Sequence, residues 1–281
     1  MLAIIGGTGL YELPGLAIER RIPAPTPFGE ASGEIVAGRL HGQAVLFLAR
    51  HGPGHRLLPH EVNYRANVYA LKAAGATMVL GVSAVGSLAA DVVPGELAVP
   101  EQYLDWTRGR REASFFGRGV VAHVSTARPV SASLVDALEA AAARIGVRLR
   151  RALTYACVEG PRLGTQAESH FLRAAGCQVV GMTNVPEAFL AREAQLAYAT
   201  LALVTDYDCW LDDPAQHVSV AAILERYAQT LATAKGLIDA LLQVPLPAPE
   251  REIREALASA MVTPDAALGP EQRAWLDVLR A

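Results

Sequence analysis

The chain has 281 residues, 52% of them hydrophobic and 19% charged, so it can bury a sizeable core in one large domain or two small ones. Its net charge of -3 at pH 7 gives no electrostatic reason to expect nucleic acid or an acidic membrane as a partner. The N-terminus lacks the basic segment of a signal peptide, and no apolar run approaches the roughly 18 residues of a membrane-spanning helix. The three cysteines are widely spaced, which argues against a disulfide framework or a zinc site. We therefore expect a cytoplasmic protein.

Short apolar runs rich in β-branched residues alternate with helical patterns along the chain. The predicted strands are Leu2–Ile5, Ala44–Ala49, Thr77–Val82, Leu97–Val99, Ala152–Val158, Gln178–Met182 and Ala197–Thr205. The predicted helices are Val62–Ala73, Ser133–Ile145, Glu187–Ala194 and Val220–Leu242, with shorter ones near Ile253–Met261 and Glu271–Arg280. This alternation predicts an α/β fold, a single domain with a central mixed, largely parallel β-sheet flanked by helices.

A proline-rich stretch, Val244–Pro249, is the one plausible linker in the sequence. We assign residues 1–243 to the main domain and residues 244–281 to a C-terminal helical appendage packed on it, because its two helical patterns are too short to form a domain. The segment Arg108–Arg118 is charged and punctuated by glycine, which predicts an exposed loop.

Four predicted strands are followed by residues that can bind an anion. These residues are Thr8 after a glycine turn, Arg50 and His51, Ser83 and Ala84, and Thr183. A glycine turn exposes backbone N–H groups and an arginine offers a planar fork of donors, although a plain turn and a surface arginine are the alternatives. Ligands of α/β sheets bind at the carboxyl ends of strands, so these residues form a phosphate site without a metal if the ends converge. His55 and His60 lack further ligands at useful spacing, so no metal site is predicted.

Two aspartates follow the last predicted strand, in the sequence Thr205-Asp-Tyr-Asp-Cys-Trp210. If this segment stays extended, Asp206 and Asp208 point the same way. Two carboxyl groups in an apolar site cannot both ionise easily, so one pKa should rise and leave a proton for general acid catalysis. A hydrogen-bonded turn and a Mg²⁺ site are the alternatives.

Six short motifs, taken in chain order, make this sequence similar to the trimeric class of purine nucleoside phosphorylases, and in particular to the branch acting on methylthioadenosine. They are Ile5–Leu10 (IGGTGL), Ala49–Gly52 (ARHG), Val62–Asn67 (VNYRAN), Glu159–Arg162 (EGPR), Gly181–Thr183 (GMT) with Val185–Glu187 (VPE), and Thr205–Trp210 (TDYDCW). The resemblance spans roughly residues 2 to 243 and implies that residues 1–243 form the nucleoside phosphorylase domain. It implies a homotrimer with inorganic phosphate as co-substrate and no metal or other cofactor.

The resemblance also implies a role for each matching residue. The implied phosphate-binding residues are Thr8, Arg50, His51, Ser83, Ala84 and Thr183. The implied nucleoside-binding residues are Met182 under the ribose, Leu163 and Gly164 near the base, Val220, Ile223 and Leu224 around the 5' substituent, and His123 reaching a neighbouring subunit's site. Asp206 would protonate N7 of the purine. Asp208 would accept a hydrogen bond from the 6-amino group, which favours adenine over a 6-oxopurine.

The sequence departs from the family pattern at three positions near the implied base site. Leu163 replaces an aromatic residue that packs against the base, at a cost on the order of 1 kcal/mol of stacking. Gly164 lacks a side chain, and Asn184 replaces the usual threonine or glycine. Val220, Ile223 and Leu224 also fit the core face of an amphipathic helix.

We therefore expect phosphorolysis of S-methyl-5'-thioadenosine to adenine and 5-methylthioribose 1-phosphate. A phosphorylase of methylthioinosine or another purine nucleoside is the first alternative. A hydrolytic nucleosidase and a non-catalytic nucleoside-binding protein are the others. The Arg50-His51 pair argues against the nucleosidase, and the paired aspartates argue against a mere binding protein.

Overall fold

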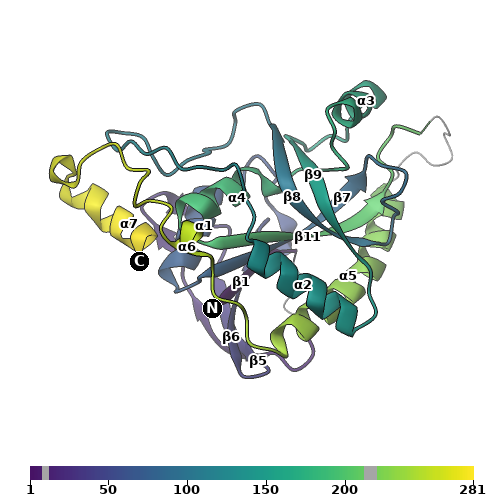
Figure 1. The fold of residues 1–281 in the computed structure, drawn as a ribbon, viewed down its shortest axis with the longest axis horizontal. Coiled ribbons are helices and arrows are strands. Elements are labelled where there is room, and N and C mark those ends of the chain that lie inside the picture. Colours follow the sequence, from purple (N-terminus) through teal and green to yellow (C-terminus); the bar gives the residue numbers. More distant parts are fainter. Residues whose placement is uncertain (8–12, 212–219) are drawn as a thin grey trace.

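A mixed β-sheet forms the centre of the protein (Figure 1). The computed structural model describes residues 1–7, 13–211 and 220–281, and within them the sheet has nine strands in the order β10-β9-β8-β11-β7-β1-β6-β5-β2. Their bounds are β1 Leu2–Gly6, β2 Ala17–Ile22, β5 Ile35–Leu40, β6 Gln43–Ala49, β7 Met78–Ser87, β8 Leu97–Trp106, β9 Leu149–Val158, β10 Val179–Gly181 and β11 Ala197–Asp206. Two short strands, β3 Pro25–Thr26 and β4 Gly29–Glu30, pair separately.

The central strands run parallel and the outer strands add antiparallel pairs. β1 pairs in parallel with β6 and β7, and β7 pairs in parallel with β11. β8 joins β11 antiparallel, and β10 pairs with both β9 and β7, so five strands close into a ring. The predicted mixed, largely parallel sheet of an α/β fold is confirmed.

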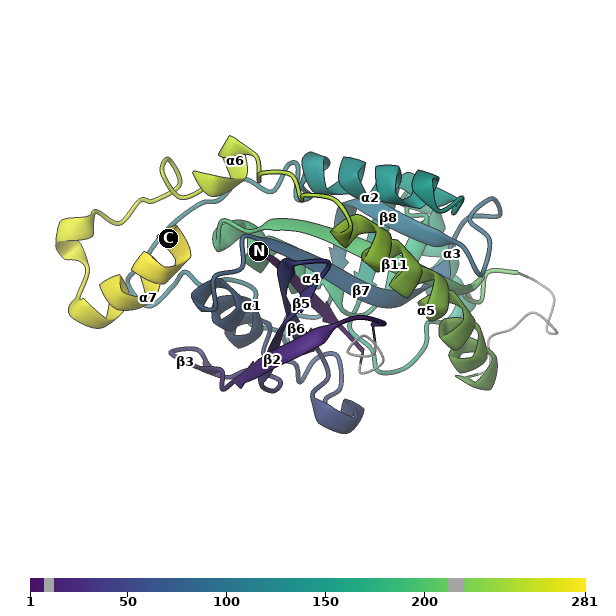
Figure 2. The same cartoon turned by 90° about the horizontal axis from the view of Figure 1, so that it is seen from below.

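Helices cover both faces of this sheet (Figure 2). The helices are α1 Tyr64–Ala73, α2 Ala132–Arg144, α3 Gln166–Ala174, α4 Asn184–Glu193, α5 Val220–Leu242, α6 Arg251–Arg254 and α7 Pro270–Arg280. The apolar stripes of α2 and α5 pack together on one face, where residues such as Leu134 and Leu237 are fully buried. α1, α4 and α7 pack on the other face. The helices on the two faces shield the strands from water, which the continuous apolar sequences of the strands require.

Several elements differ from the prediction. Strands β2 and β5 and helix α3 were not expected, and β7 and β8 continue well past their predicted ends. The segment Arg108–Arg118 is an irregular loop, but its predicted exposure is wrong at Arg111 and Phe115, which are buried. Both side chains find partners from distant parts of the chain, Glu159 for Arg111 and the Phe28 ring for Phe115.

Residues 244–281 form α6, α7 and the chain around them, and α7 lies at the opposite end of the molecule from α3 (Figures 1 and 2). Trp275, Leu276 and Leu279 of α7 are buried in the cluster beneath α1. The Gln195 side chain donates to the backbone oxygens of Leu279 and Arg280. The division of the chain into domains at residue 243 stays a prediction.

Candidate active site

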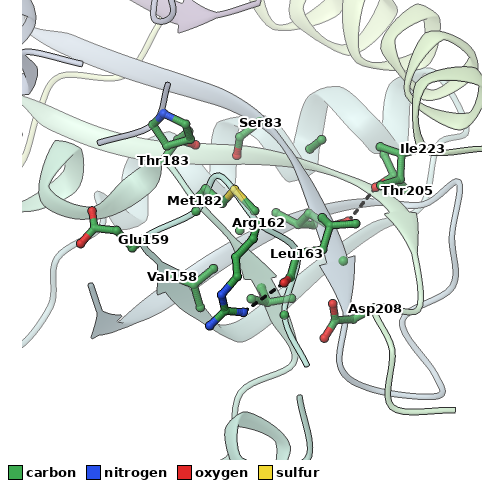
Figure 3. Close-up of a pocket in the computed structure, with 18 of the residues that line it drawn as sticks. Ser83, Val158, Glu159, Arg162, Leu163, Met182, Thr183, Thr205, Asp208 and Ile223 are labelled. Atoms are coloured by element: carbon green, nitrogen blue, oxygen red, sulfur yellow. Dashed lines mark hydrogen bonds between the residues drawn. The ribbon is translucent and has the colours of Figure 1, made fainter. Parts of the chain in front are cut away.

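A pocket with a volume of about 610 Å³ lies where the strands of the sheet end, within the size range of small-molecule sites (Figure 3). The predicted site residues among its lining are Arg50, His51, Ser83, Ala84, Leu163, Gly164, Met182, Thr183, Asp206, Asp208 and Ile223. They come from the ends of β6, β10 and β11, the middle of β7, the loop after β9, and α5. The fold thus brings the strand ends together as expected, while the binding role of each residue stays a prediction.

Four predicted residues remain. Thr8 and the side chain of Val220 lie outside the part of the chain that the structure describes. Leu224 is 61% exposed and is not among the described residues that line the pocket, because it lies on the solvent face of α5. His123 also lies apart from the lining, and its backbone N–H donates to the oxygen of Ala260.

The Arg50 guanidinium is buried and is held in two-point contact by a carboxylate. Its Nε and Nη2 donate to the two oxygens of Glu187 at 2.7 and 2.8 Å. Nη1 donates to the Val82 oxygen at 2.8 Å, and Nη2 also reaches the Ile5 oxygen at 3.2 Å. Burial acts to lower the pKa of Arg50, but the charge and hydrogen bonds of Glu187 raise it above its ordinary value.

This arrangement corrects the expected two-point contact between Arg50 and phosphate. Glu187 occupies the fork, and among the described residues only one N–H of Nη1 has no acceptor. Arg50 can therefore offer an anion at most one direct hydrogen bond in this conformation. Glu187 was not predicted as the partner of Arg50, because the two residues lie 137 positions apart in the sequence.

Two neighbours of Arg50 in the pocket differ in their free hydrogen-bonding groups. His51 donates from Nδ1 to the Leu57 oxygen at 2.8 Å and stacks on His55. Burial, and after it the charge of Arg50, lower the pKa of His51 to about 4, so its ring is neutral at pH 7 and Nε2 is an acceptor. The Thr183 hydroxyl is buried with no partner among the described residues. A buried hydroxyl of this kind in a pocket wall is available to a ligand.

The two aspartates do not continue an extended strand. β11 ends at Asp206, and Asp208 lies in a turn with a φ of 54°. The backbone N–H of Asp208 donates to Oδ1 of Asp206 at 2.7 Å, and the Thr205 hydroxyl donates to Oδ2 at 2.6 Å. Both side chains still line the pocket.

The pKa of Asp206 is raised, as expected for one member of the pair. Burial is the main cause, and the Asp208 charge adds a smaller increment. The hydrogen bonds from Thr205 and Asp208 act in the opposite direction. Among the described carboxyl groups that line the pocket, Asp206 is therefore the one whose surroundings most favour a bound proton.

A second buried ion pair, also missed, positions the pocket rim. Arg111 donates to Glu159 at 3.0 Å and to the Val185 oxygen at 2.6 Å. Glu159 in turn accepts from the backbone N–H of Arg108, which lines the pocket with Arg110.

Leu163, at the predicted base site, is 46% exposed. In the described ranges no three His, Cys, Asp or Glu side chains gather to hold a metal ion, and no helix is long and apolar enough to cross a membrane.

Comparisons with known proteins find relatives over nearly the whole chain. A protein of Geobacter sulfurreducens named S-methyl-5'-thioadenosine phosphorylase is 46% identical, over 99% of this chain and 97% of its own length. A protein of the same name from Rhodospirillum rubrum is 49% identical, over 94% of this chain and 90% of its own. The crystal structure of a methylthioadenosine phosphorylase from an antarctic soil metagenomic library has a TM-score of 0.93 at 43% identity, covering 99% and 98% of the two chains.

A more distant structure, the methylthioadenosine phosphorylase of Schistosoma mansoni in complex with adenine, has a TM-score of 0.81 at 35% identity. It covers 86% of this chain and 90% of that one. The sequence model of the Phosphorylase superfamily matches residues 1–243, which contain every described residue of the pocket lining. The chain belongs to the phosphorylase superfamily.

Proposed function

We propose that the protein catalyses phosphorolysis of S-methyl-5'-thioadenosine, giving adenine and 5-methylthioribose 1-phosphate. The observation that carries the proposal is one pocket in which a carboxyl group of raised pKa, Asp206, faces the same space as the unpartnered Thr183 hydroxyl. An acid for the leaving base and donors for an anion are the two requirements of this reaction. The names of relatives 46% and 49% identical to the chain support the same substrate.

In the proposed reaction the bond between C1' of the ribose and N9 of the purine stretches first, which leaves positive charge on the sugar. The electron pair of this bond moves into the purine, and Asp206 donates its proton to N7 as that charge develops. A phosphate oxygen then forms the new bond to C1'. The proton and the electron pair both leave with adenine, so no metal or organic cofactor is needed.

We assign the phosphate to the part of the pocket formed by Arg50, His51, Ser83, Ala84 and Thr183, with Thr8 added from the sequence. In Figure 3, Ser83 and Thr183 lie at one end of the pocket and Asp208 lies well apart from them. Arg50 contributes its charge and one N–H rather than its whole fork. We therefore place the anion at the end of the pocket that lies away from Asp208.

The nucleoside would occupy the remainder of the pocket. We place the base near Asp206, Asp208, Leu163 and Gly164, and the ribose over Met182. Ile223 lies apart from Ser83 and Thr183 in Figure 3 and supplies apolar contact for the 5' substituent, with Val220 added from the sequence. The predicted homotrimer, with His123 entering a neighbour's site, and the cytoplasmic location remain part of this proposal.

Incubation of the purified protein with methylthioadenosine or methylthioinosine, each with and without phosphate, tests the proposed function. We expect adenine release that depends on phosphate, because Asp208 can accept from a 6-amino group but not from a 6-oxo group. Release of hypoxanthine alone would keep the reaction class and overturn the base preference. Base release without phosphate would favour a hydrolytic nucleosidase.

A further inference from the structure

Behind Ser83 lies a chain of buried hydrogen bonds that the proposed reaction does not use. The Ser83 hydroxyl donates to Oδ1 of Asn184 at 2.8 Å, and Nδ2 of Asn184 donates to the Tyr198 oxygen at 2.8 Å. Tyr198 donates to Oε1 of Glu187 at 2.8 Å, and Glu187 is the carboxylate that holds Arg50. We call the four residues Ser83, Asn184, Tyr198 and Glu187 the relay. All four are buried.

The carboxylate at the inner end fixes the direction of every hydrogen bond in the relay. Glu187, held in two-point contact by Arg50, can only accept, so Tyr198 must use its single proton to donate to it. Burial raises the pKa of Tyr198, so it keeps that proton. The Tyr198 oxygen must then accept from the amide nitrogen of Asn184, because a flipped amide would place two acceptors against each other. The amide oxygen of Asn184 therefore faces Ser83.

Ser83, the last residue of the relay, must therefore use its hydroxyl proton to donate to Asn184. The single hydroxyl proton of Ser83 points at Asn184, and the oxygen of Ser83 retains only lone pairs. Ser83 lines the pocket, and Figure 3 shows its oxygen directed toward the other lining side chains. A bound ligand therefore meets an acceptor here, in a site where an anion would ordinarily be met by donors.

The backbone of β7 approaches the relay closely at Gly81. A Cβ atom at Gly81 would lie 2.5 Å from the Tyr198 oxygen and 2.8 Å from Oε1 of Glu187. Any side chain at Gly81 would displace the relay, so β7 is built to bring the backbone against it. Asn184 is also one of the three positions at which the sequence departs from the expected family pattern.

We propose that the relay makes this site selective for oxyanions that carry a proton over anions of the same shape that carry none. Hydrogen phosphate and hydrogen arsenate present an O–H group that can donate to Ser83, whereas sulfate presents only acceptors. The inference rests on the proposed function, since it takes Ser83 as part of the phosphate site.

The test is a comparison of inorganic phosphate, arsenate and sulfate at pH 7 and constant ionic strength. An assay of adenine release measures the KM of phosphate and the KM of arsenate. The same assay measures the inhibition constant of sulfate when it competes with phosphate. We expect sulfate to bind on the order of tenfold to a hundredfold more weakly than phosphate, and arsenate to resemble phosphate. Equal binding of sulfate and phosphate by the unmodified protein would overturn the proposal.

Two variants test the relay itself. Asn184→Leu removes the acceptor that holds the Ser83 proton, so the hydroxyl can turn and donate to sulfate, and Ser83→Ala removes the hydroxyl. We expect both to lower the ratio of the sulfate inhibition constant to the phosphate KM by about tenfold. Thr183→Val is the matched control, because it removes a donor that serves both anions and should leave the ratio unchanged. An unchanged ratio in both Asn184→Leu and Ser83→Ala would contradict the role of the relay.

Isothermal titration of the protein with phosphate and with sulfate, without nucleoside, separates this inference from the proposed function. If base release does not depend on phosphate, the proposed function fails while the titration still tests selectivity. If adenine release depends on phosphate but the two anions bind equally, the relay proposal fails alone.

Discussion

Replacing Asp206 with alanine is expected to lower the kcat of adenine release by a factor of about 10²–10⁴, with a much smaller change in KM. The loss follows because no other described carboxyl group of the pocket combines burial with a raised pKa near the strand end of β11. The general acid must be protonated, so kcat should also fall as the pH rises through the raised pKa of Asp206. Steady-state kinetics across a pH series measure both effects.

Asp239→Ala is the matched control for Asp206. Asp239 accepts from the His41 side chain and does not appear in the described lining of the pocket, so its loss should leave kcat unchanged. Asp206→Asn adds a second comparison, since an amide keeps the shape and can donate a hydrogen bond but cannot transfer its proton. Near-normal turnover in Asp206→Ala would remove Asp206 from the role of general acid.

Glu187→Ala is expected to reduce the free energy of unfolding by about 3–5 kcal/mol, because it leaves the buried Arg50 charge without its partner. The side chains of Arg50 and Glu187 are 2% and 1% exposed, so water cannot replace the missing carboxylate. A loss of this size lowers the Tm of a chain of this length by roughly 10 °C. Denaturant titration and thermal unfolding measure it.

Glu255→Ala provides a matched control in the same protein. Glu255 pairs with Arg251 at one turn's spacing on the surface, where the two side chains are 48% and 81% exposed. Water screens such a pair, so its removal should leave the free energy of unfolding almost unchanged. If Glu187→Ala and Glu255→Ala lower the free energy of unfolding by similar amounts, the buried Arg50–Glu187 pair does not stabilise the fold as proposed.

The sequence predicted those parts of the fold in which consecutive apolar residues identify a buried strand. β1, β6 and β11 are continuous apolar runs covered on both faces, and each was predicted close to its true position. β2 was missed because its residues, Ala17–Ile22, are almost all exposed and show no apolar period. α3 was missed although Thr165 and Glu168 form a capping box, a signal present in the sequence.

The site was predictable to the extent that it lies at strand ends. Arg50, Ser83, Thr183 and Asp206 all line one pocket, as the position of each after a predicted strand suggested. Their partners were not predictable, because Glu187 is 137 residues from Arg50 and no local pattern links them. The fork of Arg50 was accordingly assigned to phosphate when it belongs to Glu187.

The sequence left two conformations open for Asp206 and Asp208, an extended segment and a hydrogen-bonded turn. The backbone turns at Asp208, where its N–H bonds to the Asp206 carboxylate two residues earlier. Short hydrogen bonds of an aspartate to its own backbone compete with strand geometry in this way.

Identification of the sugar product tests the central claim most directly. Mass spectrometry of the products formed from methylthioadenosine in phosphate buffer distinguishes a sugar that carries a phosphate from a free sugar. The proposed reaction predicts one 5-methylthioribose 1-phosphate for each adenine released. Free 5-methylthioribose in its place would show that water attacks C1', and would contradict the assignment of Arg50, Ser83 and Thr183 to a phosphate co-substrate.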